Sequence, residues 1–324
     1  MNGREPDVLV VGAGVCGLTT AIRLAEAGLG VTIRASRLSP GITSVAAGAL
    51  WGPHLVEHSE RVTRWSLDTL DTLLDLAGQP GTGVRVAQGI EAARTPVEPP
   101  GWVTELPGFR RCGPGELPEG MVTGWQFRAP VVDMLVYLGY LLDRFTGAGG
   151  RLQVATVGSL AQAARDAAVV VNCTGAAAHH LVPDPTVRPV RGQAVVVANP
   201  GLTDFLVVPT EHGTEFSYLF PHQDTVVLGG TEQPGNWSLD PDPETSRRIL
   251  ARCAVLEPRL AGAPILAERV GLRPARPRVR LEAERPDGGG LILHNYGHGG
   301  AGVTLAWGCA RDISGQVLAL SSPG

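Results

Sequence analysis

The sequence contains no lysine, because all 27 of its basic residues are arginine. This absence excludes enzymes that form a Schiff base through lysine, that anchor pyridoxal phosphate, or that hold a nucleotide with a P-loop lysine. The formal net charge is only −4, and the chain carries no basic block. Nucleic acid and anionic membranes are therefore not expected as partners, and a small-molecule substrate is.

The chain also lacks a long hydrophobic run. No apolar stretch reaches the roughly 18 to 20 residues of a membrane helix, and no signal peptide pattern follows Met1. Both absences predict a cytoplasmic protein without a membrane partner. With 324 residues, 44% of them hydrophobic, the chain is long enough for about two domains.

Cysteines are few, and none has a metal-site spacing. The five are odd in number and widely separated, without a Cys-x-x-Cys pair or a zinc-type Cys/His pattern. We interpret them as small buried hydrophobic residues and predict no metal site.

A glycine-rich turn lies near the N-terminus. An apolar run, Asp7–Val11, leads into a G-x-G-x-x-G motif with glycines at Gly12, Gly14 and Gly17, then a helical pattern and a second β-rich run, 31–33. In such a βαβ unit the first glycine makes the tight turn, the second admits a pyrophosphate, and the third lets the helix pack on the strand. The motif therefore predicts dinucleotide binding, with Val15 at the start of the helix.

The residues at the end of the second strand do not decide which dinucleotide is bound. A carboxylate that binds ribose hydroxyls is expected there, whereas this chain has Ser36 and Arg37. Serine followed by arginine is also how NADP sites hold a 2′-phosphate, so this motif alone does not separate FAD from NADP.

The segment from His294 to Cys309 favours a flavin. Its glycines at Gly297, Gly299, Gly300 and Gly302 allow the backbone to approach a flat ring just before a predicted helix. The N-terminus of that helix would stabilise the negative charge that a reduced flavin carries at its N1/C2=O edge.

The remaining pattern predicts an α/β protein with an inserted sheet. Helices are expected at Glu57–Leu76, Val131–Phe145 and Pro243–Leu256. Residues 80–120, rich in proline and glycine, are expected to form loops with short strands. Strands are expected at Leu152–Val157, 169–171, Ala194–Ala198, Phe205–Val208, Phe216–Phe220 and Val226–Leu228. We expect a Rossmann-like nucleotide domain (1–50, 130–190 and 268–324) and a mainly antiparallel substrate domain (51–129 and 191–267).

Read together, the motifs resemble the D-amino acid oxidase family over essentially the whole chain. They are the N-terminal turn, Val45-Ala46-Ala47-Gly48, Asn172-Cys173-Thr174-Gly175, Gly229-Gly230-Thr231, Gly271-Leu272-Arg273-Pro274-Ala275-Arg276-Pro277 and the His294–Cys309 segment. The resemblance implies FAD as cofactor. It also implies oxidation of a D-amino acid by hydride transfer from Cα to flavin N5, with a 2-oxo acid, ammonia and hydrogen peroxide as products and oxygen as the acceptor.

The resemblance assigns three residues to the substrate. Arg273 would clamp the substrate carboxylate, because a planar guanidinium donates two parallel hydrogen bonds and keeps its charge. Tyr218 would hydrogen-bond the same carboxylate, and the backbone carbonyl of Gly300 would accept from the substrate amine. A direct hydride transfer needs no general base, and His298 is interpreted as a structural hydrogen-bonding residue.

The resemblance also assigns residues to FAD. Val157 would contact the adenine part, Thr174 and Gly175 would line the pyrophosphate side, and Thr304 would face the flavin C2=O. The other predicted FAD contacts are Gly12, Gly14, Val15, Gly17, Ser36, Arg37, Thr43, Ser44, Ala47, Gly48, Gly299 and Gly302.

Departures from the family pattern concern substrate selection. A second active-site tyrosine is replaced by Thr214, with Phe216 nearby, and Glu232 stands where D-aspartate oxidases tend to carry a basic residue. A carboxylate at that point would repel an acidic substrate side chain by about 1–2 kcal/mol. We therefore expect neutral or basic D-amino acids as substrates, with Glu232 and Phe216 setting selectivity.

Three alternatives stay open at this point: a glycine or sarcosine-type amine oxidase, a D-aspartate oxidase, and a non-catalytic or NADP-binding module. A homodimer is the oligomeric state that we consider.

Overall fold

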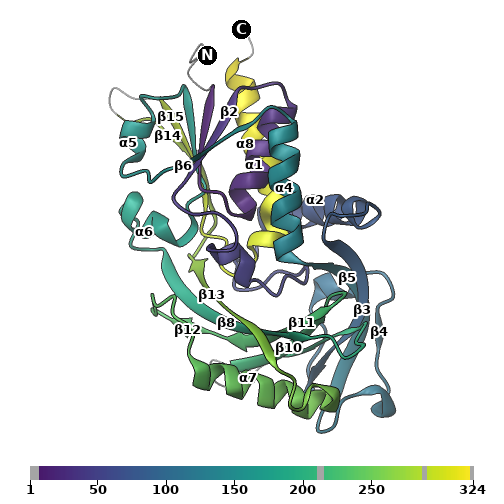
Figure 1. Ribbon diagram of the computed structural model, residues 1–324. Helices are drawn as coiled ribbons and strands as arrows, with labels where there is room; N and C mark the ends of the chain where they lie inside the picture. Colours follow the sequence, from purple (N-terminus) through teal and green to yellow (C-terminus); the bar gives the residue numbers. More distant parts are fainter. Residues whose placement is uncertain (1–6, 210–214, 287–289, 322–324) are drawn as a thin grey trace.

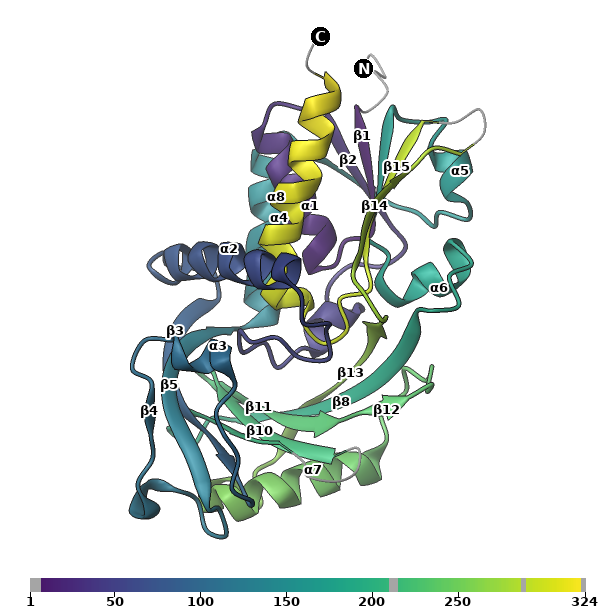
Figure 2. The same ribbon diagram turned by 180° about the vertical axis from the view of Figure 1, so that it is seen from behind.

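A computed structural model of the protein describes residues 7–209, 215–286 and 290–321. It has two β-sheets, one above the other in Figure 1, and the same two layers are seen from behind in Figure 2. The first sheet takes four strands from near the two ends of the chain and two, Arg151–Val154 and Val169–Asn172, from its middle. The second sheet is built from strands between Val84 and Ala275. The α/β class and the mainly antiparallel second sheet are confirmed, whereas the predicted domain limits stay a prediction.

The first sheet has six strands in the order β14-β15-β7-β1-β2-β6. All neighbours are parallel except β14, which is antiparallel to β15. Strand β1 lies between β2 and β7, and a crevice at the carboxyl ends of such strands is where α/β sheets bind ligands. The strands are β1 (Val8–Val11), β2 (Val31–Ala35), β6 (Arg151–Val154), β7 (Val169–Asn172), β14 (Arg280–Glu284) and β15 (Leu291–Tyr296).

Both faces of the first sheet are covered. Side chains alternate along a strand, so Val8 and Val10 of β1 pack on the helical side, while Leu9 and Val11 pack against Leu160 and its neighbours on the opposite side. A parallel sheet buried on both faces requires this nearly continuous run of apolar residues.

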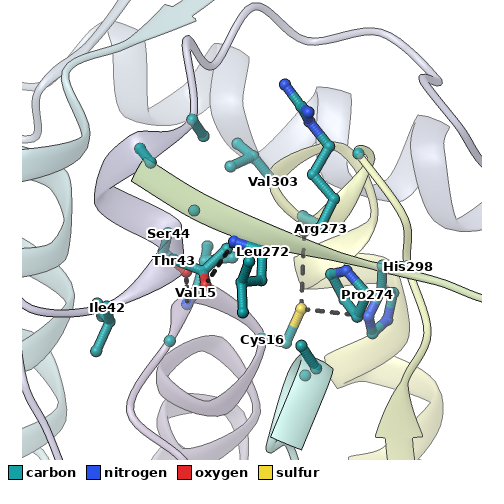
Figure 3. A pocket seen from close by; sticks show the side chains of 18 of the residues that line it. Val15, Cys16, Ile42, Thr43, Ser44, Leu272, Arg273, Pro274, His298 and Val303 are labelled. Carbon is teal, nitrogen blue, oxygen red and sulfur yellow. Dashed lines mark hydrogen bonds between the residues drawn. The ribbon is translucent and has the colours of Figure 1, made fainter. Parts of the chain in front are cut away.

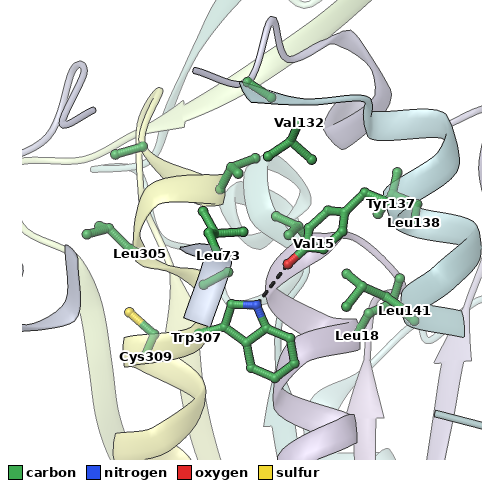
Figure 4. Packing of buried hydrophobic residues seen from close by; sticks show 14 of the residues in the cluster. Val15, Leu18, Leu73, Val132, Tyr137, Leu138, Leu141, Leu305, Trp307 and Cys309 are labelled. Atoms are coloured by element: carbon green, nitrogen blue, oxygen red, sulfur yellow. Dashed lines mark hydrogen bonds between the residues drawn. The ribbon is translucent and has the colours of Figure 1, made fainter. Parts of the chain in front are cut away.

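Three helices lie side by side on one face, as Figure 1 shows: α1 (Val15–Glu26), α4 (Met134–Gly147) and α8 (Gly302–Ser321). Figure 4 shows their packing, in which the buried indole N–H of Trp307 donates to the hydroxyl of Tyr137 at 2.8 Å. Helix α2 (Glu60–Ala77) packs across α8, where Gly308 admits the Trp65 backbone.

The second sheet has nine strands. Its main path runs β12-β8-β11-β10-β9-β3-β5-β4, and β13 pairs with β8. Helix α7 (Pro243–Leu256) covers one face, where Ile249 and Cys253 pack on Val195, Leu219 and Leu228. The strands are β3 (Val84–Ala93), β4 (Arg110–Arg111), β5 (Thr123–Val132), β8 (Arg188–Ala198), β9 (Phe205–Val208), β10 (Glu215–Pro221), β11 (Thr225–Thr231), β12 (Gln233–Pro234) and β13 (Ile265–Ala275).

Short helical turns connect these elements. They are η1 (Thr43–Ala46), α3 (Gly101–Thr104), η2 (Pro114–Glu116), α5 (Leu160–Ala163), η3 (Gly175–Ala177), α6 (Ala178–Leu181) and η4 (Pro258–Leu260).

The helix predicted at Pro243–Leu256 has those limits, with Asp242 as its N-cap. The helix predicted from Val131 begins instead at Met134, because the Asp133 side chain caps it. The expectation of loops with short strands over 80–120 is wrong for the ten-residue strand β3. The expectation rested on the proline and glycine content of the segment, but Gly89 within β3 admits the Phe205 ring and backbone of the neighbouring strand.

Candidate cofactor and substrate site

The turn after β1 requires glycine for steric reasons. Gly12 has φ +110°, and a Cβ there would lie 2.5 Å from the Cys173 carbonyl oxygen. A Cβ at Gly17 would overlap the Gly12 carbonyl, so the first turn of α1 could not pack on β1. The Val15 amide donates to Ser44 Oγ at 3.1 Å and ties η1 to the start of α1.

A cavity of about 1270 Å³ opens at this turn, between the two sheets. It exceeds the roughly 300–1,000 Å³ of ordinary small-ligand pockets, as an extended dinucleotide requires. Gly17, one turn into α1, is absent from its lining. The other predicted site residues line it: Gly12, Gly14, Val15, Ser36, Arg37, Thr43, Ser44, Ala47, Gly48, Val157, Thr174, Gly175, Phe216, Tyr218, Glu232, Arg273, Gly299, Gly300, Gly302 and Thr304.

Ser36 and Arg37 are exposed after β2 and line the cavity, as does Val157. The neighbouring turn after β7 is shaped by Asn172, a buried residue whose Oδ1 accepts from the amide and the hydroxyl of Thr174 at 3.2 and 2.7 Å. Asn172 Nδ2 lies 3.2 Å from His294 Nδ1, so a side chain of β15 holds the turn in place.

The C-terminal glycines bring two loops together. Gly299 has φ +55°, and a Cβ there would overlap the carbonyl oxygen of Leu55. A Cβ at Gly300 would lie 2.5 Å from the His54 ring. These two positions therefore require glycine because the loop with His54 and Leu55 packs on them. This requirement holds whether or not a flat ring also packs there.

Thr304, in the first turn of α8, is engaged with the same loop. Its hydroxyl donates to the Gly52 carbonyl at 2.9 Å and accepts from the Gly52 amide at 3.2 Å. Thr43 likewise accepts from the Leu272 amide at 3.3 Å. Both threonines therefore join parts of the cavity wall, a structural role that the sequence did not indicate.

His298 carries an unpaired polar atom at the cavity. Its side chain is buried, Nδ1 lies 3.7 Å from Cys16 Sγ, and Nε2 has no hydrogen-bond partner in the described chain. Burial lowers the pKa of His298 to about 4, so the ring is neutral near pH 7. A buried unpaired nitrogen, two helix N-termini and glycine-lined walls fit a flat, polar cofactor such as a flavin.

Arg273 and Tyr218 lie on the opposite wall, in the second sheet. Arg273 Nη1 donates to the Thr231 carbonyl at 2.9 Å, and its guanidinium lies 6.0 Å from the Phe216 ring centre. Figure 3 shows the Arg273 side chain on one side of β13, with Cys16 and His298 on the other. Arg273 lines the cavity, so its guanidinium places a permanent positive charge on this wall.

The Tyr218 ring is held in one place. It stacks on Phe220, with ring centres 4.5 Å apart, and a Cβ at Gly229 or Gly48 would collide with it. Burial raises the pKa of Tyr218 to about 12, and the nearby positive charge of Arg273 acts against that rise. The hydroxyl is therefore protonated and available as a hydrogen-bond donor.

Glu232 does not face the cavity as an unpaired charge. Its carboxylate lies 2.8 Å from His54 Nε2, and this hydrogen bond lowers the pKa of Glu232. Three lining residues, His54, Glu91 and Trp102, were not predicted, because no motif surrounds them. Thr214, the replacement for the second tyrosine, lies outside the described residues.

Within the described ranges, no three His, Cys, Asp or Glu side chains are grouped so that they could hold a metal ion. In the same ranges, no helix is both long enough and apolar enough to cross a bilayer.

Comparison with known proteins places these observations in a family. A family model described as FAD dependent oxidoreductase matches residues 7–315. The chain is 49% identical to a D-amino-acid oxidase of Rubrobacter xylanophilus, over 97% of both chains, and 47% identical to one of Streptomyces coelicolor, over 96% of both. Glycine oxidase from Geobacillus kaustophilus has the same fold, with a TM-score of 0.82 at 20% identity, covering 97% of this chain and 95% of that one.

Proposed function

The chain belongs to the family of FAD-dependent oxidoreductases, and on that premise we propose that it is a D-amino-acid oxidase that acts on neutral or basic D-amino acids. The main support for the proposal is that Arg273 and a protonated Tyr218 line the same wall of the cavity. The glycine-rich loop 297–302 lines another wall. One wall fits a carboxylate, and the other fits the cofactor.

The chain provides the contacts that an extended FAD requires. Ser36, Arg37 and Val157 would hold the adenosine end, and the turns at Gly12 and Thr174 would hold the pyrophosphate. When bound, FAD supplies the acceptor for the hydride that leaves the substrate Cα and passes the electrons to oxygen, which gives hydrogen peroxide. Because the family is FAD-dependent, we assign Ser36 and Arg37 to the adenosine end of FAD rather than to an NADP phosphate.

The chain's own residues would position the substrate. Arg273 would donate two parallel hydrogen bonds to its carboxylate, and the Tyr218 hydroxyl would donate a third. The Gly300 carbonyl would accept from the amine, which leaves the Cα–H directed away from the sheet wall. With both polar groups fixed in this way, one hand of the amino acid presents its Cα–H correctly.

No general base is required in this scheme. The α-carbon loses a hydride and the amine loses its proton, which gives an imino acid. Water then hydrolyses the imino acid to a 2-oxo acid and ammonia. Tyr218 is a poor base at neutral pH because burial raises its pKa.

Substrate class is argued from Glu232. Its carboxylate lies near Arg273 and would oppose a second acidic group on the substrate, although it already has a hydrogen-bond partner in His54. Glu232→Arg should move the preference from D-arginine toward D-aspartate. An unchanged ratio of the two kcat/KM values would show that Glu232 does not set this substrate preference.

The decisive experiment is anaerobic addition of D- and L-amino acids to the purified flavoprotein, followed by its visible absorbance. Bleaching by neutral or basic D-isomers alone supports the proposal. Bleaching by glycine or sarcosine, but not by bulky D-amino acids, would favour an amine oxidase of the same fold. Bleaching by D-aspartate alone would favour a D-aspartate oxidase.

A further inference from the structure

Glu91 lies in the same cross-strand row as Tyr218. On β3 it is paired with Val207 of β9, and Val207 is paired with Tyr218 of β10. All three residues line the cavity. Because neighbouring strands are about 4.8 Å apart, the α-carbons of Glu91 and Tyr218 are separated by about 10 Å. This distance suits a substrate whose carboxylate lies near Tyr218 and whose long side chain extends along the row.

Glu91 has apolar neighbours. Val207 is its cross-strand neighbour on β9, and Trp102 and Pro100 line the same cavity. No described residue forms an ion pair with Glu91. Burial raises the pKa of Glu91 to about 7, and the neighbouring indole of Trp125 acts against that rise. The Trp125 N–H is itself buried without a hydrogen-bond partner of normal geometry. A partly buried carboxylate without a cationic partner is costly unless a ligand supplies that partner.

The two acidic residues that line the cavity are not equivalent. The Glu232 carboxylate lies 2.8 Å from His54 Nε2, so it already has a hydrogen-bond partner. Glu91 lies on the other side of Tyr218, away from Arg273, and has no such neighbour. A cation on a substrate side chain would therefore gain more from Glu91 than from Glu232.

We propose that Glu91 binds the side-chain cation of a basic D-amino acid and thereby gives this enzyme a preference for D-arginine and D-lysine over neutral substrates of the same shape. The methylene stem would pack on Val207 and Trp102 while the charged head reaches the carboxylate. The proposal rests on the proposed oxidase function and adds a specificity residue to it.

The test compares D-arginine with D-citrulline, which has the same length but no charge, by anaerobic flavin reduction and steady-state kcat/KM. In Glu91→Gln the ratio of D-arginine to D-citrulline should fall by roughly 10- to 100-fold, mainly through KM for D-arginine. Glu232→Gln is the matched control, and its effect on the ratio should be much smaller. An unchanged ratio in Glu91→Gln, or a larger fall in Glu232→Gln, would overturn the assignment.

The wild-type enzyme offers a second test that does not depend on the folding of a variant. Both substrates share the α-amine and α-carboxylate, so the titration of these groups cancels in the ratio. The ratio should rise about tenfold from pH 6 to pH 8 as Glu91 ionises, because kcat/KM follows the free enzyme. The facing residues on β5 and β9, Trp125 and Val207, do not titrate in this range.

Arg273, Glu232 and His54 line the cavity on the other side of Tyr218. The profile is therefore repeated with Glu232→Gln, which should keep the rise. A ratio that does not change with pH would contradict the proposal. Failure of the proposed function has a different signature, since then neither D-citrulline nor D-methionine would bleach the flavin. Oxidation of these neutral substrates without a preference for D-arginine refutes the role of Glu91 alone.

Discussion

Acidification should destabilise this protein through His298. The imidazole is buried beside Cys16, its Nε2 atom has no partner among the described residues, and burial lowers its pKa to about 4 from an ordinary value of 6.5. The folded protein therefore keeps this ring neutral over a range of pH in which the unfolded chain protonates it. Above pH 6.5 both states are neutral, and the group has no effect on the pH dependence of stability.

The magnitude follows from the two pKa values. As pH falls below 6.5, the unfolded chain binds a proton that the folded protein does not, so the free energy of unfolding decreases. Over the 1.5 pH units between 6.5 and 5, at 1.36 kcal/mol per unit, the loss is about 2 kcal/mol. It continues to grow until pH about 4, where the folded protein is also protonated.

The assay is urea unfolding of the protein after removal of FAD, at pH 7.5 and pH 5, for the wild type and for His298→Gln. Other groups titrate in both proteins, so the quantity of interest is the difference between their pH dependences. The wild type should lose about 2 kcal/mol more than the variant between the two pH values. Equal losses in the two proteins would refute the argument that a buried neutral His298 is responsible.

Three further predictions follow from packing and charge. Arg273→Lys should lower kcat/KM for a neutral D-amino acid by roughly 100-fold with FAD still bound, because lysine cannot donate the parallel pair of hydrogen bonds. A kcat/KM within fivefold of the wild-type value would contradict this prediction. Gly299→Ala places a Cβ on the Leu55 carbonyl at positive φ and should destabilise the protein by about 2 kcal/mol or more, with a lower FAD content; an unchanged melting temperature and flavin ratio would contradict it. Tyr137→Phe leaves the buried Trp307 N–H unpaired and should lower the free energy of unfolding in urea by about 1–3 kcal/mol without altering the flavin spectrum. A decrease of less than about 0.5 kcal/mol would show that this hydrogen bond contributes little to stability.

Local features of the fold were predictable because their causes are local. The turn at Gly12 and the helix that begins after Asp242 follow from steric and capping rules that act within a few residues. Strand β3 was missed because the proline and glycine content of residues 80–120 was interpreted as loops, whereas Gly89 within the strand admits the Phe205 ring from a distant part of the chain. Glycine at such a position carries no local signal that separates the two cases.

The same distinction applies to the candidate site. Nearly every residue that the motifs predicted for the site does line the cavity. The motifs could not show which of its charged side chains already have a partner. The carboxylate of Glu232 was predicted to repel acidic substrates, and its partner His54 comes from a loop that no motif marks. Glu91 is brought toward Tyr218 by strand register alone, through an intervening strand of the second sheet. The surroundings of these two carboxylates are therefore determined by tertiary contacts. A single substitution at Glu91 tests the proposed preference more directly than one at Glu232, because Glu232 already contacts His54 whereas no described residue forms an ion pair with Glu91.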